Sequence, residues 1–419
     1  MSDRALIVQP VSTDRSLAEA LQLNDNIEET EGLAHAIDLE VCYTHVQKLS
    51  RALPSHLFGK GMRERVSGLI EEHEPDVIIV NADLSPIQHR NLEKAWKSKV
   101  IDRTALILEI FGARAQTKEG RIQVELAALS YQRSRLVRSW THLERQRGGA
   151  GFMGGPGETQ IEIDRRLIAD KISRLKKDLK KIRQNRDLQR KSRSKVPYPI
   201  VALVGYTNAG KSTLFNMLTG ANVFAEDLPF ATLDPTMRAL KLPSDDEIIL
   251  SDTVGFISNL PTQLIEAFRA TLEQVSYADI ILHVRDISSE HTDSQKQDVI
   301  HVLKEMNIDY DHDDRIIEVW NKIDRLDDGG QRDFPEHVLP ISAITGEGVE
   351  KLLSSVSEFL GRNKKSVTLQ LNPSEGQAIS WLHENADVIE EKYDEETGQI
   401  VMHMRISDKD LGQYNSKFA

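Results

Sequence analysis

Short apolar runs alternate with amphipathic stretches along the first 115 residues of the chain. Four runs have the length and composition of strands, at residues 5–10, 37–46, 75–81 and 99–103. Three stretches between them carry apolar residues at helical spacing, at residues 16–36, 59–73 and 85–97. This alternation predicts a small, mostly parallel α/β sheet. Gly59, Lys60 and Gly61 could contact a phosphate, but this pattern more commonly forms a tight turn before a helix.

The pattern changes to two long helices between residues 118 and 195. Apolar residues recur every three or four positions in both. In the first helix they are Leu126, Leu129, Leu136, Trp140 and Leu143, and in the second Ile168, Ile172, Leu175, Leu179 and Ile182. Each helix therefore has one apolar seam, and two facing seams predict an antiparallel coiled-coil hairpin. We interpret the seams as core rather than as a binding site.

A glycine-rich loop joins the two helices. Six of the ten residues 148–157 are glycines, too many to hold a regular structure unaided. Such a loop is either a flexible linker or a segment that a partner orders. Arg145 and Arg147 precede it, and Phe152 and Met153 lie within it. Cationic and apolar groups on a thin projection favour insertion into a folded RNA, where bases stack and phosphates pair.

The charge of the chain is divided unevenly. The net charge is −12, but residues 113–197 hold 22 basic against 9 acidic residues. Residues 1–112 hold 12 against 18, and residues 198–419 hold 19 against 38. The basic side chains of the second helix lie off its seam: Arg174, Lys176, Lys177, Lys180, Lys181, Arg183 and Arg186. A basic segment in an acidic protein indicates a polyanionic partner, although a solvated helix face is the simpler alternative.

The rest of the chain completes a division into four parts. A second alternating α/β segment follows a linker at residues 195–199, and the last part has strand patterns at 366–371 and 399–407 around a helical one at 375–393. We therefore predict an α/β multidomain protein. Its parts are an N-terminal domain with a small parallel α/β sheet (1–115), a basic antiparallel helical hairpin (116–196, tip loop 148–157), a second α/β domain (197–362) and a small C-terminal α+β domain (363–419).

Composition narrows the setting. No apolar run approaches the ~18 residues that a membrane span needs, and the N-terminus lacks a signal-peptide pattern. The single cysteine, Cys42, excludes an internal disulfide framework and indicates a reducing compartment, so we expect a cytoplasmic protein. The 13 histidines have no metal-ligand spacing. Nothing indicates an obligate dimer, and we expect a monomer.

The second α/β domain opens with a phosphate-binding pattern. Gly205-x4-Gly210-Lys211-Ser212 follows an apolar strand and precedes a helix. The glycines let backbone N–H groups curl around a β-phosphate. Lys211 would then reach the β- and γ-phosphates, and Ser212 would ligate Mg²⁺. The pattern therefore predicts a P-loop.

Further elements follow the P-loop in the order that a guanine-nucleotide switch requires. Asp252 ends an apolar run, where it can hold a Mg²⁺-bound water, and the N–H of Gly255 can meet the γ-phosphate. Between them and the P-loop, Thr232 is the expected switch hydroxyl on Mg²⁺, with Thr236 as the alternative. These positions predict a P-loop domain with two switch segments.

Two later loops predict the choice of base. In "NKID", Asp324 can accept hydrogen bonds from both N1–H and the 2-amino group of guanine, a pair that adenine lacks. Ser342 and Ala343 lie in a loop whose backbone can meet the base oxygen. A P-loop kinase or an ATP-driven motor has no need of such a guanine clamp. GTP and GDP are therefore the expected ligands.

The predicted site combines these elements. Its nucleotide-binding residues are Gly205, Tyr206, Thr207, Asn208, Ala209, Gly210, Lys211, Ser212, Thr213, Asp252, Thr253, Val254, Gly255, Asn321, Lys322, Asp324, Ser342 and Ala343. The predicted catalytic residues are Lys211, Thr232 and Gly255. The predicted Mg²⁺ ligands are Ser212, Thr232 and, through water, Asp252.

The combination resembles the HflX family of ribosome-associated GTPases, within the Obg-like group of translation-factor GTPases. The resemblance spans nearly the whole chain, through "LSPIQHRNLEKAW", "VIDRTALILEIFGARAQTKEGRIQVELA", "GGPGETQIEIDRR", "GYTNAGKSTLFN", "FATLDPTMR" and "DTVGFISNLP". The union of "GPGETQ" with this GTPase core is specific to the family, whereas the C-terminal part is least distinctive. The resemblance implies a GTPase that binds the large ribosomal subunit and its rRNA, and that splits or rescues stalled ribosomes, especially under stress. It also implies that the glycine-rich loop projects toward the peptidyl-transferase region.

Phe256 follows Gly255, at the position where many such enzymes keep a glutamine that orients the attacking water. A phenylalanine side chain has no hydrogen-bonding group that could orient a water, so we expect slow intrinsic GTP turnover and activation by the ribosome. The alternative is that Phe256 packs under the switch while another polar group orients the water. Asn208 resembles the asparagine of K⁺-activated GTPases, which helps to hold a monovalent cation, or else it braces the first switch.

Two functions remain open from the sequence. One is an enzyme switch, in which GTP favours a ribosome-bound form and hydrolysis releases it. The other is an RNA-binding or ribosome-assembly factor, whose GTPase times docking on precursor subunits or another RNA. Stimulation by assembly intermediates but not by mature subunits would favour the second.

Overall fold

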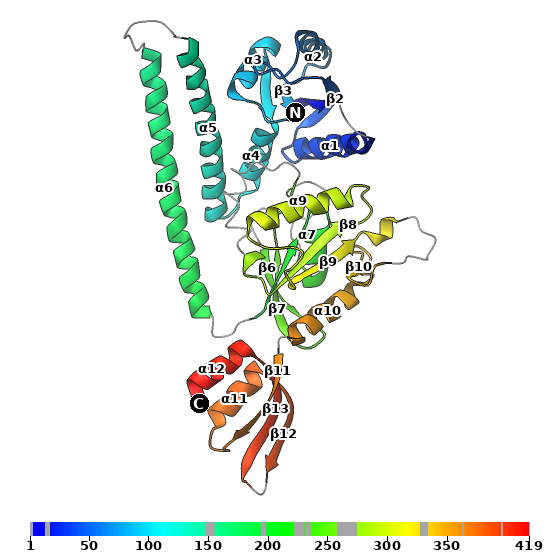
Figure 1. Cartoon of the computed structure of the whole chain (residues 1–419), viewed down its shortest axis with the longest axis vertical. Coiled ribbons are helices and arrows are strands. Elements are labelled where there is room, and N and C mark those ends of the chain that lie inside the picture. The colour runs from blue at the N-terminus through cyan, green and yellow to red at the C-terminus, as the bar shows by residue number, and fades with distance from the viewer. Residues whose placement is uncertain are drawn as a thin grey trace.

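The computed structural model describes residues 3–12, 17–146, 156–193, 198–221, 230, 236–257, 275–326, 334–362, 364–394 and 397–418. Four units follow one another along the chain (Figure 1). The N-terminal unit packs on a central α/β unit, and a hairpin of two long helices stands along one side of both. The small C-terminal unit lies at the opposite end of the molecule from the N-terminal unit.

The N-terminal unit is a four-stranded parallel sheet in the order β2-β1-β3-β4. Its elements are β1 (Arg4–Ser12), α1 (Leu17–His35), β2 (Glu40–Leu49), α2 (Lys60–His73), β3 (Val77–Val80), α3 (Pro86–Trp96), β4 (Lys99–Asp102) and α4 (Arg103–Arg114). All four predicted strands and all three predicted helices are present. Gly59 is the extended residue before α2, as expected of a turn into a helix.

Helix α4 has no counterpart in the prediction. Its buried residues surround most of its circumference: Arg103, Thr104, Leu106, Ile107, Leu108, Ile110 and Phe111. Residues 105–111 form a nearly continuous apolar run, and periodicity alone cannot assign such a short run to a helix or a strand. Its start is fixed by Asp102, whose carboxylate accepts from the N–H of Ala105 at 2.8 Å.

The hairpin consists of α5 (Lys118–Gln146) and α6 (Pro156–Arg193), which run antiparallel side by side (Figure 1). On α6, Ile172 is buried and the four other predicted seam residues are half-buried. On α5, Leu129 is buried and Leu126 half-buried, and Lys171 pairs with Glu125 across the seam at 2.6 Å. The predicted hairpin is therefore present, while the side chains of Leu136, Trp140 and Leu143 lie outside the described residues.

The second helix of the hairpin begins earlier than predicted. Pro156 and Gly157, assigned to the tip loop from the sequence, form the first turn of α6. Proline suits a first helical position because the N–H that it lacks would have no partner within the helix. The remainder of the predicted tip, residues 148–155, lies outside the described residues.

Helix α5 is fastened to the N-terminal unit at Asp102. The hydroxyl of Tyr131 donates to the Asp102 carboxylate at 2.6–2.7 Å, and Arg135 lies 3.3 Å from the same group. The Arg135 guanidinium also stacks over the Tyr131 ring, 4.6 Å from its centroid. Burial and the neighbouring Asp102 carboxylate raise the pKa of Tyr131, so the phenol stays a hydrogen-bond donor.

The central unit is a six-stranded sheet in the order β10-β9-β8-β5-β7-β6, parallel except for β6. Its strands are β5 (Ile200–Val204), β6 (Thr236–Lys241), β7 (Glu247–Asp252), β8 (Ile280–Asp286), β9 (Ile316–Asn321) and β10 (Val338–Pro340). Its helices are α7 (Lys211–Thr219), α9 (Thr292–Glu305), the 3₁₀ turn η1 (Ile323–Arg325) and α10 (Val349–Arg362). The P-loop, Asp252 and "NKID" all lie where parallel strands end, at one edge of the sheet.

In the C-terminal unit, one predicted helix is shorter than expected. Its antiparallel sheet has the order β11-β13-β12, and its elements are β11 (Lys364–Leu371), α11 (Gly376–Asn385), β12 (Asp387–Asp394), β13 (Gln399–Ser407) and α12 (Asp408–Phe418). The helix predicted over 375–393 ends at Asn385, and its second half is strand β12, paired with β13. The α+β class of the unit is confirmed.

One hydrophobic cluster is shared by the N-terminal and central units. It contains Leu33 and Phe111 from the first, and Tyr206, Val254 and Phe256 from the second. Edge-to-face packing of Phe111 on Phe230, with ring centroids 4.6 Å apart, belongs to the same contact. The N-terminal unit therefore packs directly against the P-loop and the segment that follows β7. No helix in the described part of the chain is long and apolar enough to cross a membrane.

Candidate nucleotide-binding site

The P-loop owes its shape to two glycines. Gly205 follows β5 with φ of 152°, and a Cβ there would lie 2.1 Å from the carbonyl oxygen of Val284. Gly210 precedes α7 with φ of 90°, and its Cβ would lie 2.2 Å from Nδ2 of Asn321. Neither position has room for a side chain, and the second also has a left-handed backbone. Between them, Asn208 is exposed, with φ of 61°.

Lys211 lies buried inside the curve of this loop. Its Nζ donates to the carbonyl oxygens of Gly205 at 3.0 Å and Tyr206 at 2.6 Å. Burial lowers the pKa of Lys211 to about 8, against the attraction of the Asp252 carboxylate. A phosphate at the loop would supply the missing counter-charge, so the ammonium is held in the predicted position for binding.

Ser212 and Asp252 provide the oxygen ligands expected for Mg²⁺. The Ser212 hydroxyl donates to the Asp252 carboxylate at 2.7 Å, although the two residues come from α7 and the end of β7. Within the described ranges, no group of three or more His, Cys, Asp or Glu side chains is placed to hold a metal alone. One hydroxyl and one carboxylate fit Mg²⁺, which takes its other ligands from phosphate and water.

The candidate switch threonines differ in their outcome. Thr232, predicted to be catalytic and to ligate Mg²⁺, lies outside the described residues. Thr236, the alternative, is the first residue of β6 and pairs in register with Asp252. Its place in an antiparallel strand puts its backbone beside the predicted metal site. The assignment of the switch hydroxyl therefore stays a prediction.

The segment after β7 lies tightly against the P-loop. The N–H of Phe256 donates to Gly205 at 3.1 Å, and Phe256 in turn accepts from the N–H of Thr207 at 2.7 Å. A Cβ on Gly255 would lie 2.9 Å from Thr207 and 3.1 Å from Nζ of Lys211. Only glycine fits between these groups, which places the Gly255 backbone beside the ammonium that would meet the γ-phosphate.

Phe256 packs under this segment rather than facing the loop. Its side chain is 2% exposed and belongs to the cluster shared with the N-terminal unit. Thr253 and Val254, which precede it, are also buried, and the Thr253 hydroxyl donates to Leu203 at 2.6 Å. The packing alternative for Phe256 is therefore what the structure has, and the residue gives no group that could orient a water.

Asn321 joins the P-loop to the base-recognition loops. Its Nδ2 donates to the carbonyl oxygen of Ala209 at 2.8 Å, and its Oδ1 accepts from the N–H of Ala343 at 2.9 Å. The Ala343 amide, predicted to meet the base oxygen, donates to the Asn321 side chain in this structure. Ser342 is buried, and its hydroxyl accepts from the N–H of Thr345 at 3.1 Å.

Lys322 and Asp324 differ in their exposure. The side chain of Lys322 is buried and pairs with Asp286, the last residue of β8, at 2.7 Å. Asp324 is exposed in η1, where its carboxylate is accessible to a base. Asp286 was not predicted as a site residue from the sequence. It could have been found as a carboxylate at the end of an apolar run, because β8 pairs with the strand that leads into "NKID". Thr213, also predicted, lies in the first turn of α7.

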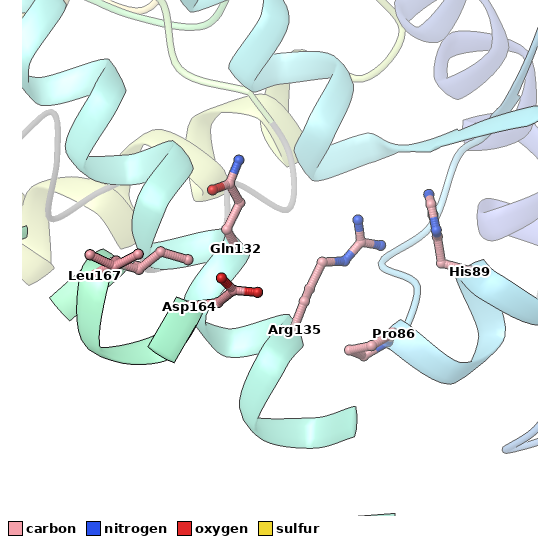
Figure 2. A pocket seen from close by; sticks show the side chains of 7 residues that line it. Pro86, His89, Gln132, Arg135, Asp164 and Leu167 are labelled. Carbon is pink, nitrogen blue, oxygen red and sulfur yellow. The ribbon is translucent and has the colours of Figure 1, made fainter. Parts of the chain in front are cut away.

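A separate cavity of about 500 Å³ lies at the hairpin rather than at the P-loop (Figure 2). Side chains from three helices line it: Pro86 and His89 of α3, Gln132 and Arg135 of α5, and Asp164, Leu167 and Ile168 of α6. His89 lies 2.7 Å from the carbonyl oxygen of Val100, and Arg135 contacts Asp102. The cavity therefore marks the junction of the hairpin with the N-terminal unit.

The fold and the P-loop site together define a P-loop GTP hydrolase. Four family models match the chain in succession. Their descriptions are GTP-binding GTPase N-terminal (residues 24–112), GTP-binding GTPase middle region (114–193), 50S ribosome-binding GTPase (200–322) and HflX C-terminal domain (331–418). GTPase HflX of Magnetococcus marinus is 49% identical over 405 residues, which cover 96% of this chain and 92% of that protein. The chain therefore belongs to the HflX family of GTPases.

A second relative agrees with this placement. GTPase HflX of Escherichia coli is 40% identical over 387 residues, which cover 91% of this chain and 90% of that protein. Among solved structures, a GTP-binding protein of the archaeon Sulfolobus solfataricus in complex with GDP is similar, with 22% identity and a TM-score of 0.45. The match covers 85% of this chain and 98% of that one.

Proposed function

We propose that this GTPase binds the large ribosomal subunit and its rRNA through the hairpin, and uses GTP binding and hydrolysis to split or rescue stalled ribosomes in the cytoplasm under stress. The observation that carries the proposal is the basic face of α6. Among the described residues of this face, Arg174, Lys176, Lys177, Lys180 and Lys181 are exposed. They belong to a helix hairpin attached to a GTP hydrolase of the HflX family. A row of cations on such a hairpin suits the phosphates of a folded RNA.

The residues of the P-loop site have defined roles in the proposed reaction. Backbone N–H groups of the P-loop hold the β-phosphate, and Lys211 pairs with the β- and γ-phosphates. Asp324 selects guanine, and Asn321 keeps the base loop and the P-loop in register. The N–H of Gly255 meets the γ-phosphate, so the position of the following segment depends on whether that phosphate is present. Mg²⁺, held by Ser212 and through water by Asp252, would neutralise developing charge on the phosphates.

The ribosome completes the active site in this proposal. Phe256 is buried and orients no water, so a group outside the described site has to stabilise the transition state. In switch GTPases, an added arginine contributes about 10³–10⁵ in rate, which sets the scale of the expected stimulation. Binding of the ribosome would order the switch segments and position such a group or the water. Hydrolysis then releases the GTPase from its partner.

The first experiment measures GTP hydrolysis by the purified protein, alone and with isolated large ribosomal subunits at fixed salt. We expect slow turnover alone and a large stimulation by mature subunits. Stimulation by precursor subunits but not by mature ones would instead support a ribosome-assembly factor. The same rate with and without either kind of subunit would reject a ribosomal partner for this GTPase.

The second experiment separates the helix from the tip loop. Replacement of Lys176, Lys177 and Lys180 by Glu should weaken subunit binding. The slope of log binding constant against log salt concentration should become less steep by about 2 to 3. Reversal of the exposed Lys94, Lys304 and Lys351 on other helices is the matched control and should leave binding unchanged. Equal losses in both variants would mean that net charge, rather than the α6 face, governs binding.

The third experiment shortens residues 148–157. The basic flanks of the hairpin remain, so we expect binding to persist while ribosome splitting falls. Splitting is followed by light scattering or sedimentation of intact ribosomes. Undiminished splitting by the shortened protein would exclude the proposed role of the loop.

A further inference from the structure

A tyrosine of the P-loop reaches out of the central unit. The hydroxyl of Tyr206 donates to the carboxylate of Glu29, which belongs to α1 of the N-terminal unit. Tyr206 is 8% exposed and the side chain of Glu29 13% exposed, so the contact is largely shielded from water. A phenol that donates to an ionised carboxylate makes a stronger bond than a neutral pair does. Two residues far apart in the chain are thus joined inside the interface.

Glu29 is itself held rigidly. Arg103, which opens α4, donates to the same carboxylate and to Oδ1 of Asn81 at 2.9 Å. Asn81 in turn donates to Oε1 of Gln9 at 2.6 Å. Gln9 lies in β1, while Asn81 and Arg103 directly follow β3 and β4. The carboxylate is therefore anchored to the sheet of the N-terminal unit and is more than a side chain on a helix surface.

At its other end, Tyr206 supports the groups that meet the phosphates. Its carbonyl oxygen accepts from Nζ of Lys211 at 2.6 Å. Its neighbours Gly205 and Thr207 hold the backbone of Phe256 on either side, at 3.1 and 2.7 Å. A shift of Tyr206 would therefore move both the ammonium and the segment that senses the γ-phosphate. The absence of space at Gly255 leaves little room to absorb such a shift.

A contact that served only to hold the two units together would not need a hydrogen bond between a phenol and a shielded carboxylate. The shared apolar cluster, with Phe111 packed on Phe230, already joins them. A shielded carboxylate loses hydration, and an apolar side chain of similar volume often stabilises such an interface as well or better. The placement of a charged acceptor on the one tyrosine whose carbonyl oxygen holds Lys211 therefore points to orientation as its role.

We propose that Glu29 is a positioning residue for GTP hydrolysis: it holds the Tyr206 hydroxyl, and through the Tyr206 backbone it orients Lys211 and the adjoining switch segment. The N-terminal unit thereby contributes to the active site without touching the nucleotide. The proposal rests on GTP hydrolysis by this chain and is independent of which ribosomal state is the partner.

The test uses single-turnover GTP hydrolysis by the full chain without ribosomes, with GDP affinity and the thermal midpoint measured in parallel. Tyr206→Phe removes only the hydroxyl, and Glu29→Ala removes its acceptor. A hydrogen bond to a charged group supports an effect of about tenfold, so each variant should slow hydrolysis by about that factor. Glu29→Gln keeps an acceptor and should recover to within about threefold of the parent. Glu31→Gln is the matched control, because Glu31 lies on the same helix and accepts from Thr44 within the N-terminal unit at 2.6 Å.

The double variant decides between positioning and simple packing. If one contact carries the effect, Tyr206→Phe with Glu29→Ala should be no slower than either single variant. A combined loss of about a hundredfold would overturn the proposal, because the two residues would then act separately. A lower thermal midpoint with unchanged hydrolysis in the single variants would overturn it as well, since Glu29 would serve only to join the units.

Discussion

Replacement of Phe256 by glutamine tests whether this GTPase lacks only the right side chain. Glutamine at this position orients the attacking water in many related enzymes. Here the side chain is 2% exposed and packs in the cluster shared by the N-terminal and central units. A glutamine would therefore enter an apolar interface. We expect Phe256→Gln to destabilise the protein without raising intrinsic GTP hydrolysis.

The size of the effect follows from the burial of the ring. Loss of a buried Phe side chain removes about 1.5–3 kcal/mol of transfer free energy. Burial of an amide without suitable partners adds about 1–3 kcal/mol. The sum is about 2.5 to 6 kcal/mol, a large part of the stability of an ordinary domain. Phe256→Met is the control, since a flexible apolar side chain of similar volume should cost less than about 1.5 kcal/mol.

Hydrogen exchange of the β5 and β7 amides measures this loss in the central unit by itself. A loss of this size should speed exchange through global opening by about 10² to 10⁴. GTP hydrolysis of the same samples is measured below the onset of unfolding. A Phe256→Gln protein that is as stable as the parent and hydrolyses GTP faster without ribosomes would refute the reasoning. It would mean that the side chain reaches the phosphates and that the enzyme is not completed from outside.

Three further predictions concern charged groups, and one concerns a monovalent cation. Lys211→Ala should abolish detectable nucleotide binding. In the parent protein, GDP affinity should fall about 30-fold between pH 7 and 9.5, because the lysine without nucleotide loses its proton near pH 8 while the phosphates require it charged. A calorimetric GDP affinity that does not change over this pH range would contradict the prediction. Asp324→Asn should erode the preference for guanine over adenine nucleotides in competition binding, and a retained preference would contradict the assigned role. The pKa of Glu318 is lowered to about 2, because hydrogen bonds from cationic neighbours and a tryptophan outweigh burial. The stability that this carboxylate contributes is present above pH 4.5 and should be lost as the pH falls toward 2. In acid unfolding, Glu318→Gln should therefore make the free energy of unfolding depend less on pH over this range. Ribosome-stimulated hydrolysis should be faster in K⁺ than in Na⁺ if Asn208 holds a cation, and equal rates would exclude that role.

The sequence predicted best those elements whose chemistry is local. The P-loop, Asp252 and "NKID" were each predicted at or after the end of an apolar strand, and in the structure all three lie at one edge of the sheet. The second half of the helix predicted over 375–393 was wrong for a physical reason. Its run of Glu390, Glu391 and Lys392 consists of strong helix formers, but the segment pairs with β13, and tertiary pairing overrides intrinsic propensity.

Other features were outside the reach of pattern reading. Helix α4 contains the nearly continuous apolar run 105–111, and periodicity alone cannot assign such a run to a helix or a strand. The contact of Glu29 with Tyr206 spans 177 positions. No spacing rule relates residues so far apart in different units. Such contacts arise only when two folded units meet, which is why the P-loop could be read from the sequence and its support could not.

The attachment of α5 at Asp102 has a mechanical consequence. Tyr131 and Arg135 hold the middle of the helix, and the helix continues to Gln146, about 22 Å further along its axis. A 10° rotation about this fulcrum would displace the end of α5 by about 4 Å, more than the length of a hydrogen bond. The residue after Asp102 is Arg103, which grips Glu29. A displacement of the far end of α5 would therefore reach Arg103 with a smaller amplitude. Arg103 contacts Glu29, the carboxylate that accepts from the hydroxyl of Tyr206 in the P-loop.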